Sequence, residues 1–236
     1  MNKIIHLADT RGFADLGWLK THHTFSFANF YNPERMGFGL LRVLNDDVID
    51  PGQGFDTHPH DNMEIVTIPL SGSIKHKDTL GNEFVINRGE IQRMSAGSGI
   101  AHSEFNASNS NKCGLLQIWV FPKKRDLPSK YGQKKFDLKG RQNNFQLIIS
   151  PDEREGSIGI NQDAFFNLAD LNQGKVISYQ IKIPGNGLYL FLISGKIKIF
   201  DIELNPRDGL GLTDTNEISI QAEKDSEILL MEVPLR

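Results

Sequence analysis

The sequence is poor in cysteine and alanine and has no long apolar run. Its single thiol, Cys113, cannot form a disulfide within the chain, so we expect a reducing compartment, the cytoplasm. No apolar run approaches 18 residues and no hydrophobic segment follows Met1, so we predict neither a membrane span nor export. Only nine alanines stand against 22 glycines and 10 prolines, a balance that argues against a helical bundle.

The sequence also lacks an excess of charge of either sign. Lysine and arginine number 26 and the acidic residues 29, for a net charge of −3, so no overall electrostatic attraction draws the chain to nucleic acid or lipid. The one basic stretch, residues 123–141, contains Pro128 and only two aromatic residues. We interpret it as a connector, and we expect no direct contact with nucleic acid.

Short apolar or alternating runs separated by glycine and proline turns fill the chain. Many short strands at this spacing are typical of an antiparallel sandwich or barrel, so the predicted fold class is all-β. The runs lie at residues 40–44, 64–70, 83–88, 114–121, 145–150, 176–183, 188–200 and 227–233.

One of these patterns occurs twice. The sequence SGSIK at 71–75 returns as SGKIK at 194–198, and each copy is followed by a long apolar strand that ends in proline, at 119–122 and 231–234. The repeat predicts two copies of one β module; a chance match in a β-rich chain is the alternative. The expected domains are residues 1–130 and 131–236.

The histidines are unevenly distributed, because none follows His102. His58 and His60 are two residues apart and would share one face of a strand, and Glu64 has the same parity. His102 and Glu104 repeat this arrangement. Three imidazoles and a carboxylate suit a first-row divalent metal, and the absence of cysteine excludes a closed thiolate zinc site. The alternative is structural: these histidines are hydrogen-bonded residues of the core and bind no metal.

Glycines frame both histidine pairs in the spacing of the two cupin motifs. The first reads Gly52-x5-His58-x-His60-x3-Glu64-x7-Gly72, and the second runs from Gly97 to Asn106. With these motifs the chain resembles the pirin family, in particular bacterial pirin-like proteins described as quercetin 2,3-dioxygenases. The other segments that carry the resemblance are GWL (17–19), HTFSFA (23–28), YNP (31–33), MGFG (36–39), LRVLNDD (41–47) and MSAGSGI (94–100).

The resemblance implies a bicupin, two antiparallel β-barrels in tandem, with one metal in the N-terminal barrel. The metal ligands would be His58, His60, His102 and Glu104. Iron is the expected metal, with zinc, manganese, nickel, copper and cobalt as alternatives. Other cupins use the glutamate at the position of Glu64 as the ligand, and spacing alone does not decide between the two carboxylates. The C-terminal barrel has no histidine, so we expect packing or recognition there.

Several further residues have both a functional and a structural interpretation. His22 and His23 could line the pocket or end a strand, while His76 is expected to be structural or exposed. Arg42 is expected in a structural ion pair or turn with the Asn45-Asp46-Asp47 segment. Five aromatic residues could form an apolar pocket wall or simply pack in the core: Trp18, Phe25, Phe27, Phe30 and Phe38.

Two functions from different classes follow. The first is a metal-dependent dioxygenase that cleaves a flavonol such as quercetin with dioxygen and releases carbon monoxide; Glu104 would accept the proton, with Glu64 as the second candidate. Its flavonol specificity is implied by the resemblance alone. The second is a metal- and redox-responsive binding or regulatory protein with a protein partner. We expect a monomer.

Overall fold

The computed structural model describes all 236 residues, which form β-strands and short 3-10 turns without any α-helix. This confirms the prediction of an all-β fold. None of the helical turns is long and apolar enough to cross a membrane. The four 3-10 turns are Ala8–Thr10, Pro33–Arg35, Leu138–Arg141 and Arg154–Gly156.

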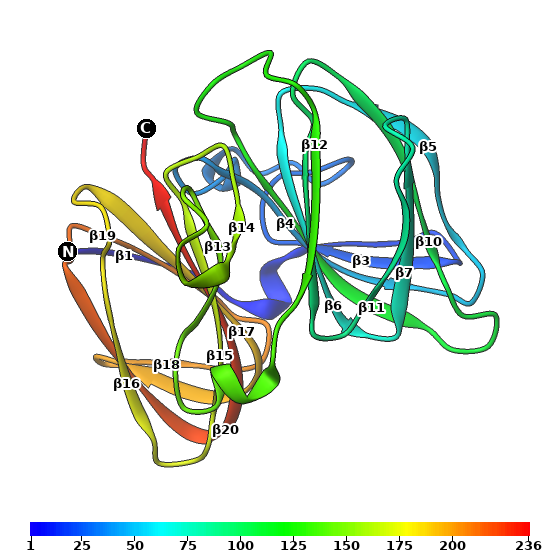
Figure 1. Cartoon of the computed structure of the whole chain (residues 1–236). Helices are drawn as coiled ribbons and strands as arrows, with labels where there is room; N and C mark the ends of the chain where they lie inside the picture. The colour runs from blue at the N-terminus through cyan, green and yellow to red at the C-terminus, as the bar shows by residue number, and fades with distance from the viewer.

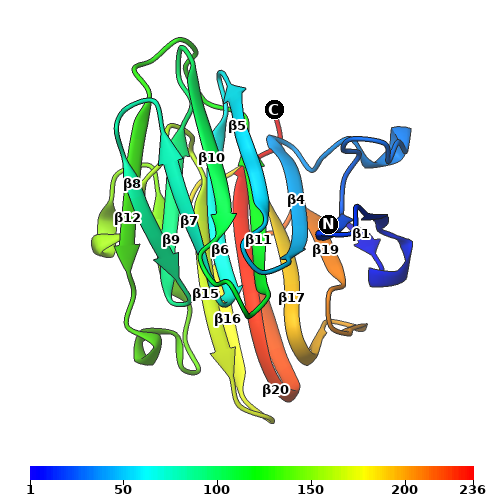
Figure 2. The ribbon, with the colours of Figure 1, turned by 90° about the vertical axis from the view of Figure 1, so that its right-hand side faces the viewer.

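Two antiparallel sheets form the N-terminal barrel (Figure 1). The view in Figure 2 looks onto the smaller of them. Its strands are, in spatial order, β5 (Gly54–His60), β10 (Ile100–Asn106), β7 (Ser73–Asp78) and β8 (Glu83–Asn87). The strands of the larger sheet are β12 (Lys130–Lys135), β9 (Glu90–Ser95), β6 (Glu64–Ser71), β11 (Cys113–Val120), β4 (Leu41–Ile49), β3 (Leu19–His23) and β2 (Gly12–Asp15).

One nine-stranded sheet curls into the C-terminal barrel, beside the first (Figure 1). Its main path is β1 (Asn2–His6), β19 (Gly209–Thr213), β17 (Asn186–Ile199), β20 (Glu217–Pro234), β15 (Phe165–Leu171), β13 (Gln146–Ser150) and β14 (Ile158–Gly159). Off this path, β16 (Val176–Gln180) pairs with β20 and β18 (Ile202–Leu204) with β17.

The repeated SGxIK segments occupy matching places in the two barrels. Each contains a glycine with left-handed backbone, φ +69° at Gly72 and +90° at Gly195, a conformation that side chains disfavour. Gly72 turns β6 into β7, and Gly195 lies at an irregularity within β17. The flanking serines pair with the last long strand of their own half, Ser71 with β11 and Ser194 with β20. These matching places support a duplicated module.

The two barrels differ in what fills them. Sixteen buried apolar residues pack together inside the C-terminal barrel, whereas the two clusters inside the N-terminal barrel hold only six and four. The largest cluster, 24 residues, lies between the barrels and joins them. Apolar side chains therefore fill the interior of the C-terminal barrel, whereas the N-terminal interior has space for polar side chains.

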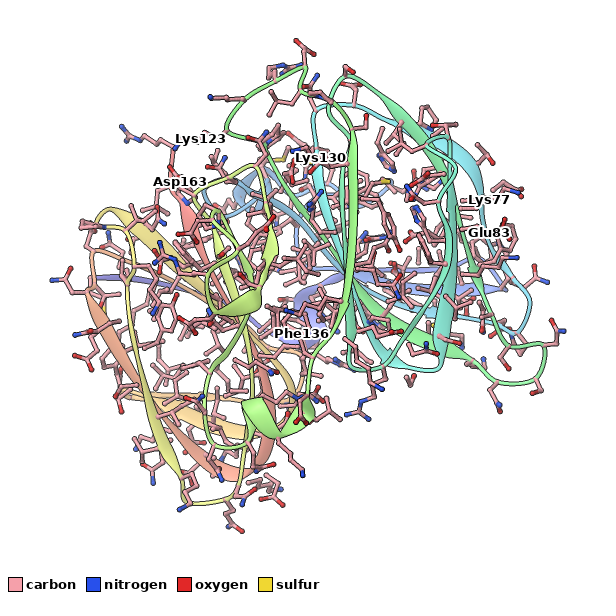
Figure 3. The ribbon with its side chains drawn as sticks, viewed as in Figure 1. Lys77, Glu83, Lys123, Lys130, Phe136 and Asp163 are labelled. Atoms are coloured by element: carbon pink, nitrogen blue, oxygen red, sulfur yellow. The ribbon has the colours of Figure 1, made fainter.

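The barrels do not divide at residue 130 as expected. Strand β12 begins at Lys130 and pairs with β9 in the N-terminal barrel, while β1 pairs with β19 in the C-terminal one. Hydrophobic periodicity marks such strands but does not say which sheet an edge strand joins. An ion pair at the junction, Lys123 to Asp163 at 2.7 Å, links the two halves (Figure 3).

Candidate metal centre

Three histidines converge in the N-terminal barrel, as their spacing predicts. His58 and His60 extend from β5, and His102 lies directly opposite His58 on β10. The ring centroids are 4.5 to 4.9 Å apart, and the three rings each have a nitrogen within 4.8 Å of the others. Three imidazoles from two paired strands can therefore bind one ion.

The hydrogen bonds around these rings fit a metal. His58 directs Nδ1 at the carbonyl oxygen of Asp56, 2.7 Å away, so that its Nε2 is the free nitrogen. A bond of this kind fixes the tautomer and orientation of metal-binding histidines. Nε2 of His102 is buried and has no hydrogen-bond partner within the protein, which is unusual for a buried polar atom. A bound ion would satisfy it.

Burial also keeps two of the rings in the form that binds metals. It is the main cause that lowers the pKa of His60 to about 4 and the pKa of His102 to about 2, with the neighbouring histidines adding to both shifts. The imidazoles are thus neutral at pH 7, and a neutral imidazole offers the lone pair that coordinates a metal.

Glu104 is buried on β10, two residues after His102. The register with β5 shifts between these two residues. Ligand atoms of Glu104, His102 and His76 all lie within 4.8 Å of one another. Gln117 donates to its Oε2 at 2.7 Å and Thr67 to its Oε1 at 3.3 Å. Burial raises the pKa of Glu104 to about 7.

A row of polar side chains, here called the polar belt, crosses the inner face of the larger sheet. The Thr67 hydroxyl lies 2.9 Å from the side-chain oxygen of Gln117, so its single proton is shared between this oxygen and Glu104. The Nδ1 of His23 lies 2.9 Å from Oδ1 of Asn45. The belt faces Glu104 across the barrel. Its members lie opposite one another on five adjacent strands: Gln92, Thr67, Gln117, Asn45 and His23.

His76 has a part in the site that sequence analysis missed. It is fully buried on β7, with Nε2 3.0 Å from Asp78 and Nδ1 2.8 Å from the amide of Gln92. The ring also approaches His102, with Nδ1 of each 3.4 Å apart, so it helps to position that ligand. The alternation of Ile74, His76 and Asp78 on one strand face was the available signal.

Glu64, the alternative carboxylate ligand and the second candidate for proton acceptor, lies away from the three histidines. Its strand β6 turns Thr67 toward Glu104 and turns Glu64, of opposite parity, to the other face of the sheet. There its Oε2 accepts hydrogen bonds from the Ser95 hydroxyl at 2.7 Å and the Asn161 amide at 3.3 Å. Glu64 thus lines a cleft of about 340 Å³ between the barrels.

A second cavity, of about 370 Å³, lies near the candidate metal centre, although none of the candidate ligands lines it. Eight of its thirteen lining residues are apolar, among them Phe27 and Phe55. The ring of Phe55 lies 6.3 Å from that of His58, and Phe27 contacts Trp119, whose ring lies 4.9 Å from that of His60. The two aromatic walls therefore connect the cavity to the metal ligands.

The other candidate residues divide between the cavity and structural places. His23, Phe27 and Phe30 line the cavity. The remaining residues pack elsewhere: His22 on Phe13, Trp18 on Phe55, and Phe25 and Phe38 in the core between the barrels. Arg42 makes no ion pair and instead donates to the Ser26 carbonyl at 2.7 Å; Asp46 pairs with Arg11 and Arg207.

Comparison with known proteins agrees with this architecture. Residues 5–120 match the family described as Pirin, and residues 147–233 match one described as quercetinase C-terminal cupin domain. The chain is 43% identical over 228 residues to the quercetin 2,3-dioxygenase of Escherichia coli, covering 96% of both chains. It is 39% identical to a pirin-like protein of Caulobacter vibrioides, covering 95% of this chain and 96% of that one.

A solved structure of a bacterial pirin has the same fold. The crystal structure of the bacterial pirin YhhW from Escherichia coli, in complex with nickel(II), superposes with a TM-score of 0.94 at 41% identity and covers 99% of each chain. With two barrels, three convergent histidines and relatives that match over nearly the whole length, this chain belongs to the pirin family.

Proposed function

We propose that this protein is a metal-dependent dioxygenase that cleaves a flavonol such as quercetin. The observation that carries the proposal is the convergence of three histidines, two of which are linked through aromatic side chains to an apolar cavity of about 370 Å³. The names of its relatives, quercetin 2,3-dioxygenase, give the reaction class. Flavonol and dioxygen together contain all the atoms of the products, carbon monoxide and a depside, so no further reductant is needed.

His58, His60 and His102 would hold the metal, with Glu104 as the fourth ligand. When bound, a divalent metal acts as a Lewis acid that lowers the pKa of a coordinated hydroxyl. Iron is the proposed ion, and nickel, which a related bacterial pirin binds, is the first alternative. The donor set of imidazole and carboxylate suits either ion.

Glu104 would accept the proton of the flavonol 3-hydroxyl when its carboxylate has moved off the metal. Its Oε1 has the weaker hydrogen bond, 3.3 Å from Thr67, whereas Gln117 holds Oε2 at 2.7 Å. Oε1 is thus the oxygen that can exchange its partner for a substrate hydroxyl. A carboxylate placed in this way among buried side chains is suited to act as a general base at neutral pH.

The cavity would hold the planar rings and keep water away from the reacting atoms. Phe27, Phe30 and Phe55 provide flat apolar contacts of the kind that aromatic ligands bind. Glu64 has no place in this reaction, since it faces the cleft between the barrels.

Oxygen uptake and carbon monoxide release on addition of quercetin to the iron-loaded protein test the proposal. The double variant His58→Ala with His60→Ala should lose its metal and both signals. Metal-loaded protein that consumes no oxygen with flavonols would contradict the proposal and favour a metal-responsive binding protein. Full metal retention by the double variant would instead contradict the assignment of the ligands.

A further inference from the structure

Asp47 is a buried carboxylate that the proposed reaction does not use. It lies on β4, opposite Thr21 of β3, and is only 4% exposed. Its Oδ1 is buried and has no hydrogen-bond partner within the protein. A buried polar atom without a partner is destabilising and rare in folded proteins, so it calls for an explanation.

The protein supplies no cation for this carboxylate. The two nearby arginines, Arg11 and Arg207, form ion pairs with the neighbouring Asp46 on the other face of the sheet. No lysine or arginine lines the cavity that Asp47 faces. Burial is the main cause that raises the pKa of Asp47 to about 7. A hydroxyl of a ligand in the cavity, which Asp47 lines, would supply the missing donor.

The surroundings of Asp47 make one end of the cavity polar. Thr21, His23 and Asn45 line the cavity together with it, from the paired strands β3 and β4. Since Nδ1 of His23 lies 2.9 Å from Oδ1 of Asn45, the ring proton is on Nδ1 and its Nε2 is an acceptor. Two acceptors at the end of an aromatic slot suit a ligand that carries hydroxyl donors on a flat ring.

We propose that Asp47 accepts a hydrogen bond from a phenolic hydroxyl of the bound substrate and so selects hydroxylated flavonols over the parent compound. The inference rests on the proposed function, because the substrate class comes from there. Asp47 would bind a ring hydroxyl other than the reacting 3-hydroxyl, while Phe27 and Phe55 connect the cavity to the ligands His58 and His60. Specificity of this kind arises when a site leaves a buried polar group unpaired with the wrong ligand.

Equilibrium binding to the metal-loaded protein without oxygen tests the proposal, since no turnover then occurs. The probes are quercetin and 3-hydroxyflavone, which keeps the reacting hydroxyl and ketone but lacks the ring hydroxyls. Asp47→Leu should weaken quercetin binding by about tenfold or more and change 3-hydroxyflavone binding by less than about twofold. Asp50→Asn, on an exposed ion pair outside the cavity, is the control and should alter neither.

Metal content and thermal melting are measured on each variant. If Asp47→Leu does not fold, Asp47→Asn replaces it; this variant keeps the shape, loses the negative charge and should still weaken quercetin alone. Equal effects on both ligands, or none, would overturn the inference while the proposed function stands. If the unaltered protein binds neither flavonol, the proposed function fails and the inference fails with it.

Discussion

The side-chain amide of Gln117 donates a hydrogen bond of 2.7 Å to Oε2 of Glu104 and thereby joins the two sheets of the N-terminal barrel. Gln117 belongs to the polar belt on the larger sheet, and Glu104 to the smaller sheet that carries the three histidines. The orientation of this carboxylate is therefore set by a strand that contributes no metal ligand.

Replacing Gln117 by leucine should loosen the metal without removing a ligand. Loss of the amide leaves Oε2 of Glu104 without its closest donor. Changes to groups that orient a metal ligand typically reduce affinity or activity about 10–100-fold. Competition with a chelator, measured on purified Gln117→Leu protein, checks this. Thr67→Val removes the longer 3.3 Å contact with Glu104 and the 2.9 Å contact with Gln117 but leaves the 2.7 Å bond from Gln117 to Glu104, so it should have the smaller effect. The reverse order would contradict the proposed geometry.

The two carboxylates should behave differently when they are removed. Glu104→Ala takes away a proposed ligand and should empty the site, with loss of oxygen uptake. Glu64→Ala is a matched control, a buried glutamate on the other face of the same barrel, and should keep both metal and turnover. Metal analysis of the two proteins side by side decides. An empty Glu64→Ala protein would show that the ligand assignment is wrong.

Because His6 is buried, the free energy of unfolding should fall in mild acid. Its Nδ1 lies 2.7 Å from the hydroxyl of Tyr189, and burial lowers its pKa to about 4 from 6.5. The unfolded chain therefore takes up a proton at a higher pH than the folded protein does. The contribution is complete above pH 6.5 and is lost as pH falls toward 4, by up to about 3 kcal/mol.

His6→Gln, compared with the unaltered protein by urea unfolding from pH 7 to pH 4.5, isolates this contribution. The variant should lose less stability on acidification, because the other buried histidines titrate equally in both proteins. Parallel curves for the two proteins over this range would rule out a role for His6.

Two glycines of the C-terminal barrel allow the cost of backbone strain to be measured separately from the cost of a steric clash. Gly174 and Gly195 both have left-handed backbone, at φ +80° and +90°. A Cβ on Gly174 would meet nothing within 4 Å, but one on Gly195 would lie 2.2 Å from the backbone oxygen of Asp225. Gly174→Ala should cost about 1 kcal/mol in unfolding free energy, and Gly195→Ala about 3 kcal/mol or more. Similar losses in chemical denaturation would exclude the close approach.

The sequence was sufficient to predict the fold class and the convergence of three histidines. Both depend on local patterns, because alternation along a strand places His58 and His60 on one face wherever that strand lies. The pairing of β12 with β9 was not predictable, since edge strands choose their sheet by packing. The same holds for β1, whose partner β19 is over 200 residues away.

The surroundings of the metal ligands were also not predictable from the sequence. Glu64 would share the parity of the histidines if one strand continued from His60. The strand is instead interrupted at residues 61–63, between β5 and β6. The glutamate therefore begins a strand in the other sheet. Asp47 and Gln117 lie in ordinary strand sequences, and only the pairing of β11, β4 and β3 brings them to the cavity and the carboxylate.

The pairing of β1 with β19 ties the first residues of the chain to strands made near the end of its synthesis. Asn2 lies opposite Thr213, so at about 5–20 residues per second the first strand waits roughly 10–40 s on the ribosome for its partner. During that time Ile4 and Ile5 belong to an unpaired strand, the kind of segment that chaperones and neighbouring chains bind. The N-terminal barrel can close around its histidines earlier, because all its strands lie between residues 12 and 135. A nascent chain would thus acquire its metal ligands in place before its own first strand is secured.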